Sequence, residues 1–128
     1  MRLLLDTQVA LWALTDDPRL SPQARGAVLD AHSEVFVSVA TLWEIAIKYQ
    51  LRRGDMPISG SRARELFRSA GFAELPILGE HALAVETLPS IHGDPFDRIL
   101  VAQAFTEPLR LLTHDRTVAR YSDAIVFV

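Results

Sequence analysis

Short apolar runs recur along the chain and are separated by longer segments of a different pattern. The runs are rich in Leu, Val, Ile and Phe and are only a few residues long, which is typical of strands buried on both faces of a sheet. One run contains Pro76, which predicts an edge strand because proline cannot donate to a ladder. The predicted strands cover residues 2–5, 35–39, 72–77, 109–113 and 124–128.

Apolar residues recur every three or four positions in the intervening segments, which predicts helices. Ser21 and Pro22 suit the N-cap and first position of one helix, and Asp94 and Pro95 give the same signal for another. The predicted helices cover residues 7–14, 21–32, 42–49, 59–70, 79–88, 94–105 and 116–121.

Strands and helices alternate throughout, without an internal repeat, a low-complexity segment or a linker. This alternation predicts a single α/β domain over residues 1–128, with a mainly parallel central sheet and right-handed crossovers. Helices on both faces of that sheet would give a three-layer α/β/α sandwich.

The composition of the chain excludes several kinds of functional site. The chain has 49% hydrophobic residues, a formal net charge of −3 and no cysteine. The absence of cysteine excludes disulfides, thiolate nucleophiles and cysteine-ligated zinc. The negative charge argues against purely electrostatic binding of nucleic acid, but not against a nuclease whose metal ions reverse the local sign.

The apolar N-terminal segment does not predict a signal peptide. Asp6 interrupts the stretch from Met1 to Leu14, and no small-residue cleavage site follows. No apolar stretch approaches the length of about 20 residues that spans a bilayer. We therefore expect no membrane association, and a cytoplasmic location is compatible with the sequence.

Acidic residues stand where a parallel sheet would bring them together. Asp6 and Asp115 each follow a predicted strand, Glu44 lies on an apolar helix face, and Asp94 and Asp97 share one helix start. All of them can converge on the carboxyl edge of the sheet. Clustered carboxylates repel one another unless cations lie between them, and oxygen ligands favour Mg²⁺ or Mn²⁺.

Each acid also has a simpler structural interpretation, which the sequence leaves open. Asp6 and Asp115 can cap the helices that follow them, and Asp94 can cap the helix at residue 95. Glu44 can pair with Lys48 one turn later. A surface pair, however, does not require the apolar neighbours that Glu44 has.

Two other acidic α/β classes fit the sequence poorly. A receiver-type phosphoacceptor domain needs a lysine after a late strand, whereas Lys48 is the only lysine and lies on an early helix. A haloacid-dehalogenase-like phosphatase needs a second Asp two residues after the first, and Gln8 occupies that position.

Four segments carry a resemblance to a known family: Leu4-Leu5-Asp6-Thr7, Trp43-Glu44-Ile45, His92-Gly93-Asp94-Pro95-Phe96-Asp97-Arg98 and Thr113-His114-Asp115. In this order, and over the whole length, the chain resembles the PIN domain and, more narrowly, the VapC-type toxins of toxin–antitoxin pairs. The resemblance implies a Mg²⁺-dependent endoribonuclease, usually dimeric and held inactive by an antitoxin. The alternative is a PIN-like module that binds protein or RNA without turnover.

The resemblance also implies roles for individual residues. The catalytic acids would be Asp6, Glu44, Asp97 and Asp115. Asp6, Asp97 and Asp115 would hold one or two Mg²⁺ ions, with Mn²⁺ as a substitute, and Glu44 or Asp115 would orient the attacking water. Hydrolysis would leave a 5′-phosphate and a 3′-hydroxyl.

Supporting roles follow for residues next to these acids. Asp94 would be an auxiliary acid or only a cap, and His92 a turn residue before the helix, while His114 has no assigned role. Thr7 and Thr113 would orient the ligands, and Arg98 and Arg116 would contact RNA phosphates.

Two further regions are candidates for contacts with partners. The loop at residues 52–57 opens with two arginines that could face phosphates or solvent. The apolar helices around Trp12 and Trp43 could form a homodimer surface, although Trp43 suits a core position equally well.

Overall fold

The structure is a computed structural model that describes residues 1–52 and 55–128. Its sheet has five strands in the order β3-β2-β1-β4-β5, and every neighbouring pair is parallel. The strands are β1 (Arg2–Leu5), β2 (Glu34–Ser38), β3 (Ala73–Leu75), β4 (Arg110–Thr113) and β5 (Val126–Phe127). The parallel sheet is therefore confirmed, and so is the edge position of β3.

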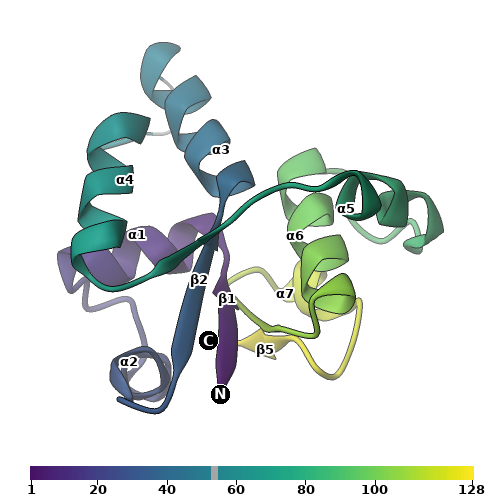
Figure 1. The fold of residues 1–128 in the computed structure, drawn as a ribbon, viewed down its shortest axis with the longest axis horizontal. Coiled ribbons are helices and arrows are strands. Elements are labelled where there is room, and N and C mark those ends of the chain that lie inside the picture. The colour runs from purple at the N-terminus through teal and green to yellow at the C-terminus, as the bar shows by residue number, and fades with distance from the viewer. Residues whose placement is uncertain (53–54) are drawn as a thin grey trace.

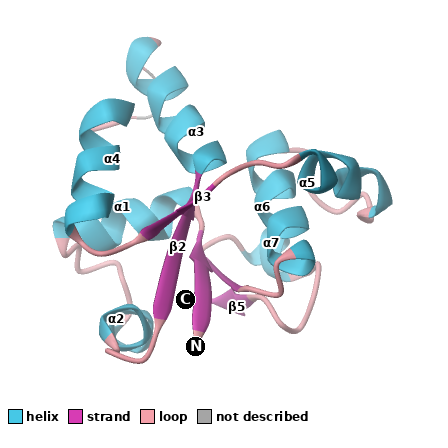
Figure 2. Cartoon of the chain, in the orientation of Figure 1, coloured by secondary structure: helices cyan, strands magenta, loops and turns pink. Residues whose placement is uncertain are grey.

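Helices cover both faces of the sheet, which confirms the three-layer sandwich (Figures 1 and 2). Helices α1, α2 and α4 lie on one side, and α5, α6 and α7 lie on the other. The helices are α1 (Thr7–Thr15), α2 (Pro22–Leu29), α3 (Val39–Gln50), α4 (Gly60–Ser69), α5 (Gly79–Ala84), α6 (Pro95–Thr106) and α7 (Arg116–Ala119).

The central strand β1 shows why its sequence is an unbroken apolar run. Leu3 and Leu5 belong to the core on one face, and Leu4 belongs to the core on the other. Successive side chains of a strand point to opposite faces, so a strand covered on both faces has only buried positions. All three leucines are completely buried.

Several predicted elements are shorter in the structure: α2 ends at Leu29, α7 ends at Ala119, and β5 covers only Val126–Phe127, while Val39 begins α3 instead of ending a strand. Prolines follow two further elements that end early. The helix predicted over residues 79–88 is α-helical only to Ala84 and continues as a 3₁₀ turn, Val85–Thr87. Leu88 then adopts an extended conformation, as residues before a proline generally do. Strand β3 ends at Leu75, directly before Pro76, which has no N–H for the ladder.

The two tryptophans proposed for a dimer surface differ sharply in exposure. Trp12 is 5% exposed and belongs to the core, so it offers no such surface. Trp43 is 59% exposed and contacts Phe96 edge to face, with the ring centroids 5.3 Å apart. It is therefore a surface residue and not part of the core.

Two further expectations concern the loop and membranes. In the basic loop at residues 52–57, Arg53 and Gly54 lie outside the described residues. None of the helices in the described part of the chain combines the length and apolar composition needed to span a bilayer.

Candidate functional site

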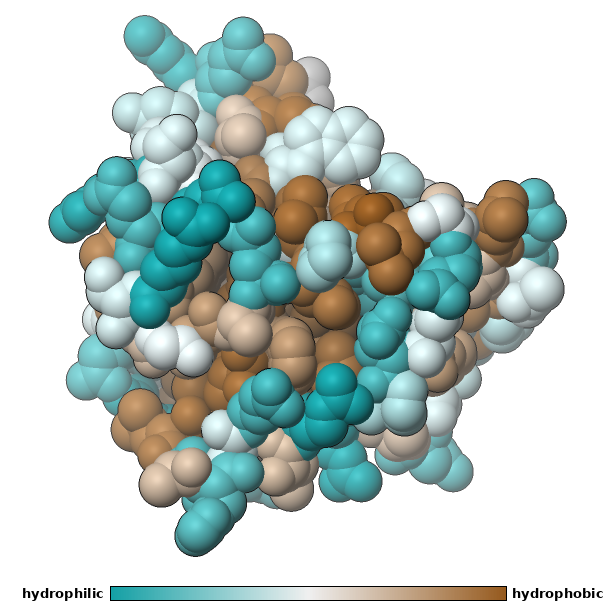
Figure 3. Space-filling view, viewed as in Figure 1, coloured by the Kyte–Doolittle hydropathy of each residue, from teal (hydrophilic) through white to brown (hydrophobic). Residues whose placement is uncertain are grey.

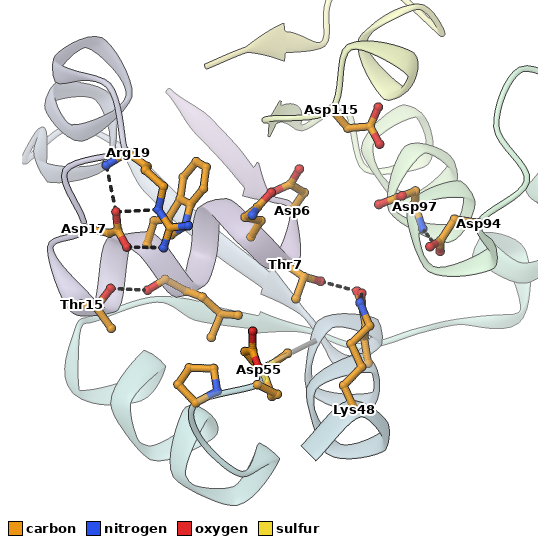
Figure 4. A pocket seen from close by; sticks show the side chains of 16 residues that line it. Asp6, Thr7, Thr15, Asp17, Arg19, Lys48, Asp55, Asp94, Asp97 and Asp115 are labelled. Carbon is orange, nitrogen blue, oxygen red and sulfur yellow. Dashed lines mark hydrogen bonds and ion pairs between the residues drawn. The ribbon is translucent and has the colours of Figure 1, made fainter. Parts of the chain in front are cut away.

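The parallel sheet brings the predicted acids to one edge. Asp6 follows β1 directly, and Asp115 follows β4, the neighbour of β1 in the sheet. Glu44 is carried by α3, which begins where β2 ends, and Asp97 lies in the first turn of α6. These four acids and Asp94 line one cleft of about 690 Å³ (Figure 4).

Asp6 lies buried at the floor of this cleft and is held by three donors. Its Oδ1 accepts the backbone N–H of Val9 at 2.8 Å, which confirms the predicted N-cap of α1. Its Oδ2 accepts the Thr113 hydroxyl at 2.6 Å and the His114 amide at 3.1 Å. Burial raises the pKa of Asp6 against the opposing effect of these hydrogen bonds. Three of about four lone-pair sites on the carboxylate are occupied, so one remains for a ligand.

Glu44 combines the two interpretations that the sequence left open. It is only 7% exposed, and its Oε2 accepts the Lys48 ammonium at 2.5 Å. Its Oε1 accepts the Thr7 hydroxyl at 2.6 Å, and the Thr7 and Thr41 hydroxyls lie 3.2 Å apart. The pair with Lys48 is therefore confirmed, and it joins a lysine whose side chain is 40% exposed to a buried Glu44 that also binds Thr7.

Asp97 has a strongly raised pKa. Asp94 caps α6, its Oδ1 accepting the amides of Phe96 and Asp97 at 2.8 and 3.2 Å, which confirms the predicted cap. Burial and then the charge of Asp94 raise the pKa of Asp97 to about 7 against the opposing effect of His92, with smaller contributions from Asp6 and Glu44. Asp97 thus lies where negative charge is crowded.

Asp115 lies at the rim, with 41% of its side chain exposed. Its Oδ1 accepts the amides of Thr117 and Val118 at 2.8 and 3.3 Å, and its Oδ2 lies 3.0 Å from Nε2 of His92. Partial burial acts to raise the pKa of Asp115, but the hydrogen bonds from His92 and the two amides outweigh it and hold that pKa below its usual value.

Arg98 is hydrogen-bonded within the protein, and its predicted contact with RNA phosphates stays a prediction. Its Nη1 donates to the carbonyls of Pro89 and His92 and to the Tyr121 hydroxyl, and its Nη2 donates to the carbonyl of Val85. These hydrogen bonds fasten the loop before α6 to that helix and to Tyr121.

Arg116 and His114 have distinct surroundings. Arg116 is exposed, with its guanidinium carbon 4.3 Å from the centroid of the Phe127 ring. The His114 ring lies between Trp12 and Phe127, with its Nδ1 2.6 Å from the carbonyl of Val128. His114 is thus packed against the last strand, and only its backbone amide reaches Asp6.

The opposite wall of the cleft was missed by the sequence reasoning. Arg19 lies over the Trp12 ring, 5.1 Å from its centroid, and donates two side-chain hydrogen bonds to Asp17. These three residues line the cleft. No motif in the sequence points to this wall, because the direction in which α1 leaves the sheet decides what the residues after it face.

The donor set fits a hard divalent cation. Three carboxylates converge in one part of the cleft (Figure 4). They belong to Asp6 after β1, Asp97 on α6 and Asp115 after β4. Burial and repulsion from nearby carboxylates raise the pKa of both Asp6 and Asp97. A bound cation would reduce this repulsion and stabilise the charged carboxylates. Carboxylate oxygens suit Mg²⁺ and Mn²⁺ better than softer metals.

Fold and site together define a parallel α/β protein with an acidic cleft at the carboxyl edge of its sheet. A model of the PIN domain matches residues 3–124, and the chain belongs to the PIN domain family. Ribonuclease VapC22 of Mycobacterium tuberculosis is 31% identical over 118 residues, which cover 89% of this chain and 87% of that protein.

Solved structures share this fold at low sequence identity. VapBC2 from Rickettsia felis, bound to a DNA fragment from its promoter, matches with a TM-score of 0.72 and 13% identity, covering 100% of this chain and 98% of that one. A toxin–antitoxin complex from Klebsiella pneumoniae matches with a TM-score of 0.67 and 21% identity, over 97% and 95% of the two chains.

Proposed function

We propose that this protein is a metal-dependent endoribonuclease that hydrolyses RNA phosphodiester bonds and acts as the toxin of a toxin–antitoxin pair. The observation that carries the proposal is the meeting of Asp6, Glu44, Asp97 and Asp115 in one cleft. The similarity to Ribonuclease VapC22 supports RNA as the substrate. The effect on the cell would be a limit on translation or growth.

Asp6, Asp97 and Asp115 are the residues that would hold Mg²⁺ or Mn²⁺. A bound divalent cation would supply positive charge for the scissile phosphate and for the charge that develops in the transition state. The Thr113 hydroxyl fixes Asp6 by donating to it, and accepts the backbone amide of Asp115 at 3.0 Å. One side chain therefore orients two of the three ligands.

Glu44 would orient the attacking water. Thr7 and Lys48 each occupy one of its oxygens, which fixes the carboxylate and leaves further lone pairs to accept from water. Arg116 is the second candidate for contact with RNA phosphates, because it is an exposed residue next to Asp115. Asp94 caps α6 and adds negative charge next to Asp97.

The proposal includes two partners, a protein antitoxin and a second copy of the chain. The likeness to toxin–antitoxin complexes supports a protein antitoxin that blocks this cleft in a cytoplasmic complex. Homodimerisation is supported by exposed apolar surface: Figure 3 shows apolar side chains at the centre of one face, over the segment that links β3 to α5, where Ile77 and Leu78 are 36% and 45% exposed. Light scattering of the purified protein tests the dimer.

The decisive experiment is cleavage of a mixed RNA pool by the purified protein with Mg²⁺, with Mn²⁺ and with EDTA. Asp6→Asn and Asp97→Asn are compared with Asp123→Asn, which removes an exposed acid that does not line the cleft. We expect metal-dependent cleavage that both cleft variants lose and the Asp123 variant keeps. Equal cleavage by all variants would refute the proposal. RNA binding without cleavage would favour a non-catalytic module.

A further inference from the structure

The His92 side chain reaches two of the proposed metal ligands through a single ring nitrogen. Its Nε2 lies 3.0 Å from Oδ2 of Asp115 and 3.4 Å from Oδ2 of Asp97. These three side chains come from the loop before α6, from α6 itself and from the end of β4. The imidazole therefore joins two acids that are distant in the sequence.

Hydrogen bonding at the other ring nitrogen fixes what Nε2 can do. The backbone N–H of Asp94 donates to Nδ1 of His92 at 3.0 Å, so Nδ1 presents a lone pair there. A neutral imidazole with an acceptor at Nδ1 carries its hydrogen on Nε2. Nε2 is then a donor toward Asp115, and it has no lone pair with which to bind a metal or to take a proton from water.

The backbone of His92 is held from both sides. Its N–H donates to the Tyr121 hydroxyl at 2.9 Å, and its carbonyl accepts from Nη1 of Arg98 at 3.3 Å. Arg98 also donates to the same hydroxyl at 3.0 Å. This clamp limits the movement of the loop, so the ring presents Nε2 to the acids from a fixed position.

We propose that His92 is a positioning residue: through its Nε2–H it holds the Asp115 carboxylate beside Asp97 at the spacing that a shared cation requires. The inference rests on the proposed function, because it assumes that these acids bind a metal. Hydrogen bonds to ligating carboxylates fix their orientation, and losing one commonly weakens metal affinity by about 10–100-fold.

Two substitutions separate this role from that of a turn residue. In His92→Asn, the amide oxygen can replace Nδ1 and accept the Asp94 N–H, but the side chain is too short to reach Asp115. In His92→Gln, the amide nitrogen can replace Nε2 and donate to Asp115, while the contact with the Asp94 amide is lost. His32→Asn removes an exposed histidine and is the matched control.

The test measures Mn²⁺ affinity of the four proteins by calorimetry, together with RNA cleavage and melting temperature. We expect His92→Asn to melt near the wild type but to bind Mn²⁺ about 10-fold more weakly. We expect His92→Gln to regain most of the affinity, and His32→Asn to match the wild type. The ¹⁵N chemical shifts of the metal-free protein should show the His92 ring hydrogen on Nε2.

Several results would overturn the inference. Wild-type Mn²⁺ affinity in His92→Asn would reduce His92 to a turn residue, and loss of affinity in His92→Gln equal to that in His92→Asn would remove the hydrogen bond as the cause. Coupling of a directly bound nitrogen to Mn²⁺ in pulsed electron paramagnetic resonance would make His92 a ligand. A wild type that neither binds Mn²⁺ nor cleaves RNA would refute the proposed function as well.

Discussion

Asp6 and Asp115 occupy equivalent positions and behave in opposite ways. They follow the neighbouring parallel strands β1 and β4, and each caps the next helix with its Oδ1. Asp6 is 6% exposed, and its pKa is raised by burial. The Asp115 side chain is 41% exposed, and its pKa is lowered by hydrogen bonds from His92 and two amides that outweigh its partial burial.

This difference shows that a local motif fixes geometry while the tertiary surroundings fix electrostatics. Both aspartates accept three hydrogen bonds, so hydrogen bonding alone does not separate them. The difference in burial separates their pKa values, because removing a carboxylate from water disfavours its charged form. The charged form of Asp6 would therefore be stabilised by a cation, whereas the charged form of Asp115 is already stabilised by its hydrogen bonds.

The largest expected contrast is in activity. Asp6→Asn should reduce RNA cleavage about 10³-fold, because it removes a charge from the buried floor, where water screens little. Asp115→Asn should reduce cleavage about 10–100-fold, because its charge is partly screened at the rim. Cleavage rates at saturating Mn²⁺ measure both effects, and equal losses would contradict the distinction between floor and rim.

The second contrast is in the pH dependence of stability without metal. The pKa of Asp97 is raised to about 7, so its ionisation destabilises the fold, and stability should fall as pH rises from about 4 through 7. Asp97→Asn should therefore increase the free energy of unfolding at pH 8 by about 1–3 kcal/mol, and little at pH 4.

Asp115→Asn serves as the comparison in the same experiment. The lowered pKa of Asp115 means that its charged form stabilises the fold above pH 4 and that this contribution is lost as pH falls through its folded pKa. The variant should lose stability at pH 8. Urea unfolding in EDTA from pH 4 to 8 measures both, and an unchanged slope in Asp97→Asn would disprove the explanation.

A third substitution tests the hydroxyl that links the two aspartates. Thr113→Val removes the donor to Asp6 and the acceptor for the Asp115 amide, and it should cost about 1–3 kcal/mol of stability because Thr113 is fully buried. Thr113→Ser keeps the hydroxyl and should recover most of that loss. Wild-type stability in Thr113→Val would contradict a stabilising role of the hydroxyl.

The smallest effect is expected for Lys48. Its side chain is 40% exposed, so Lys48→Met should change the free energy of unfolding by less than about 1 kcal/mol even though its partner Glu44 is buried. Thermal unfolding of Lys48→Met, Glu44→Gln and the double variant measures the coupling. A coupling well above this value would mean that Lys48 is energetically part of the buried network.

The sequence predicted the framework well because its signals are local. Buried strands of a parallel sheet appear as apolar runs, and Asp6, Asp94 and Asp115 stand at predicted helix starts, where capping was one of the two interpretations left open and is confirmed by the structure. The family motifs then identified the acids that the fold brings to one cleft. Nothing in that reasoning required knowledge of distant contacts.

The remaining features depend on contacts between distant segments. The Arg98 guanidinium is held by carbonyls on an irregular loop and by the Tyr121 hydroxyl, and no spacing rule links these groups. The exposure of Trp43 depends on which face of α3 meets α4 and the sheet. Burial at Asp6 and Asp97, which sets their pKa values, is likewise a property of the assembled fold.

The place of β1 at the centre of the sheet has a consequence for synthesis. The hydrogen bond from Thr113 to Asp6 joins residues 107 positions apart, and β4 can pair with β1 only after both have left the ribosome. A nascent chain already carries Asp6 and Glu44 long before Asp115 is translated. Each growing polypeptide therefore has an incomplete cleft until Asp115 has left the ribosome, which delays any nuclease activity until then.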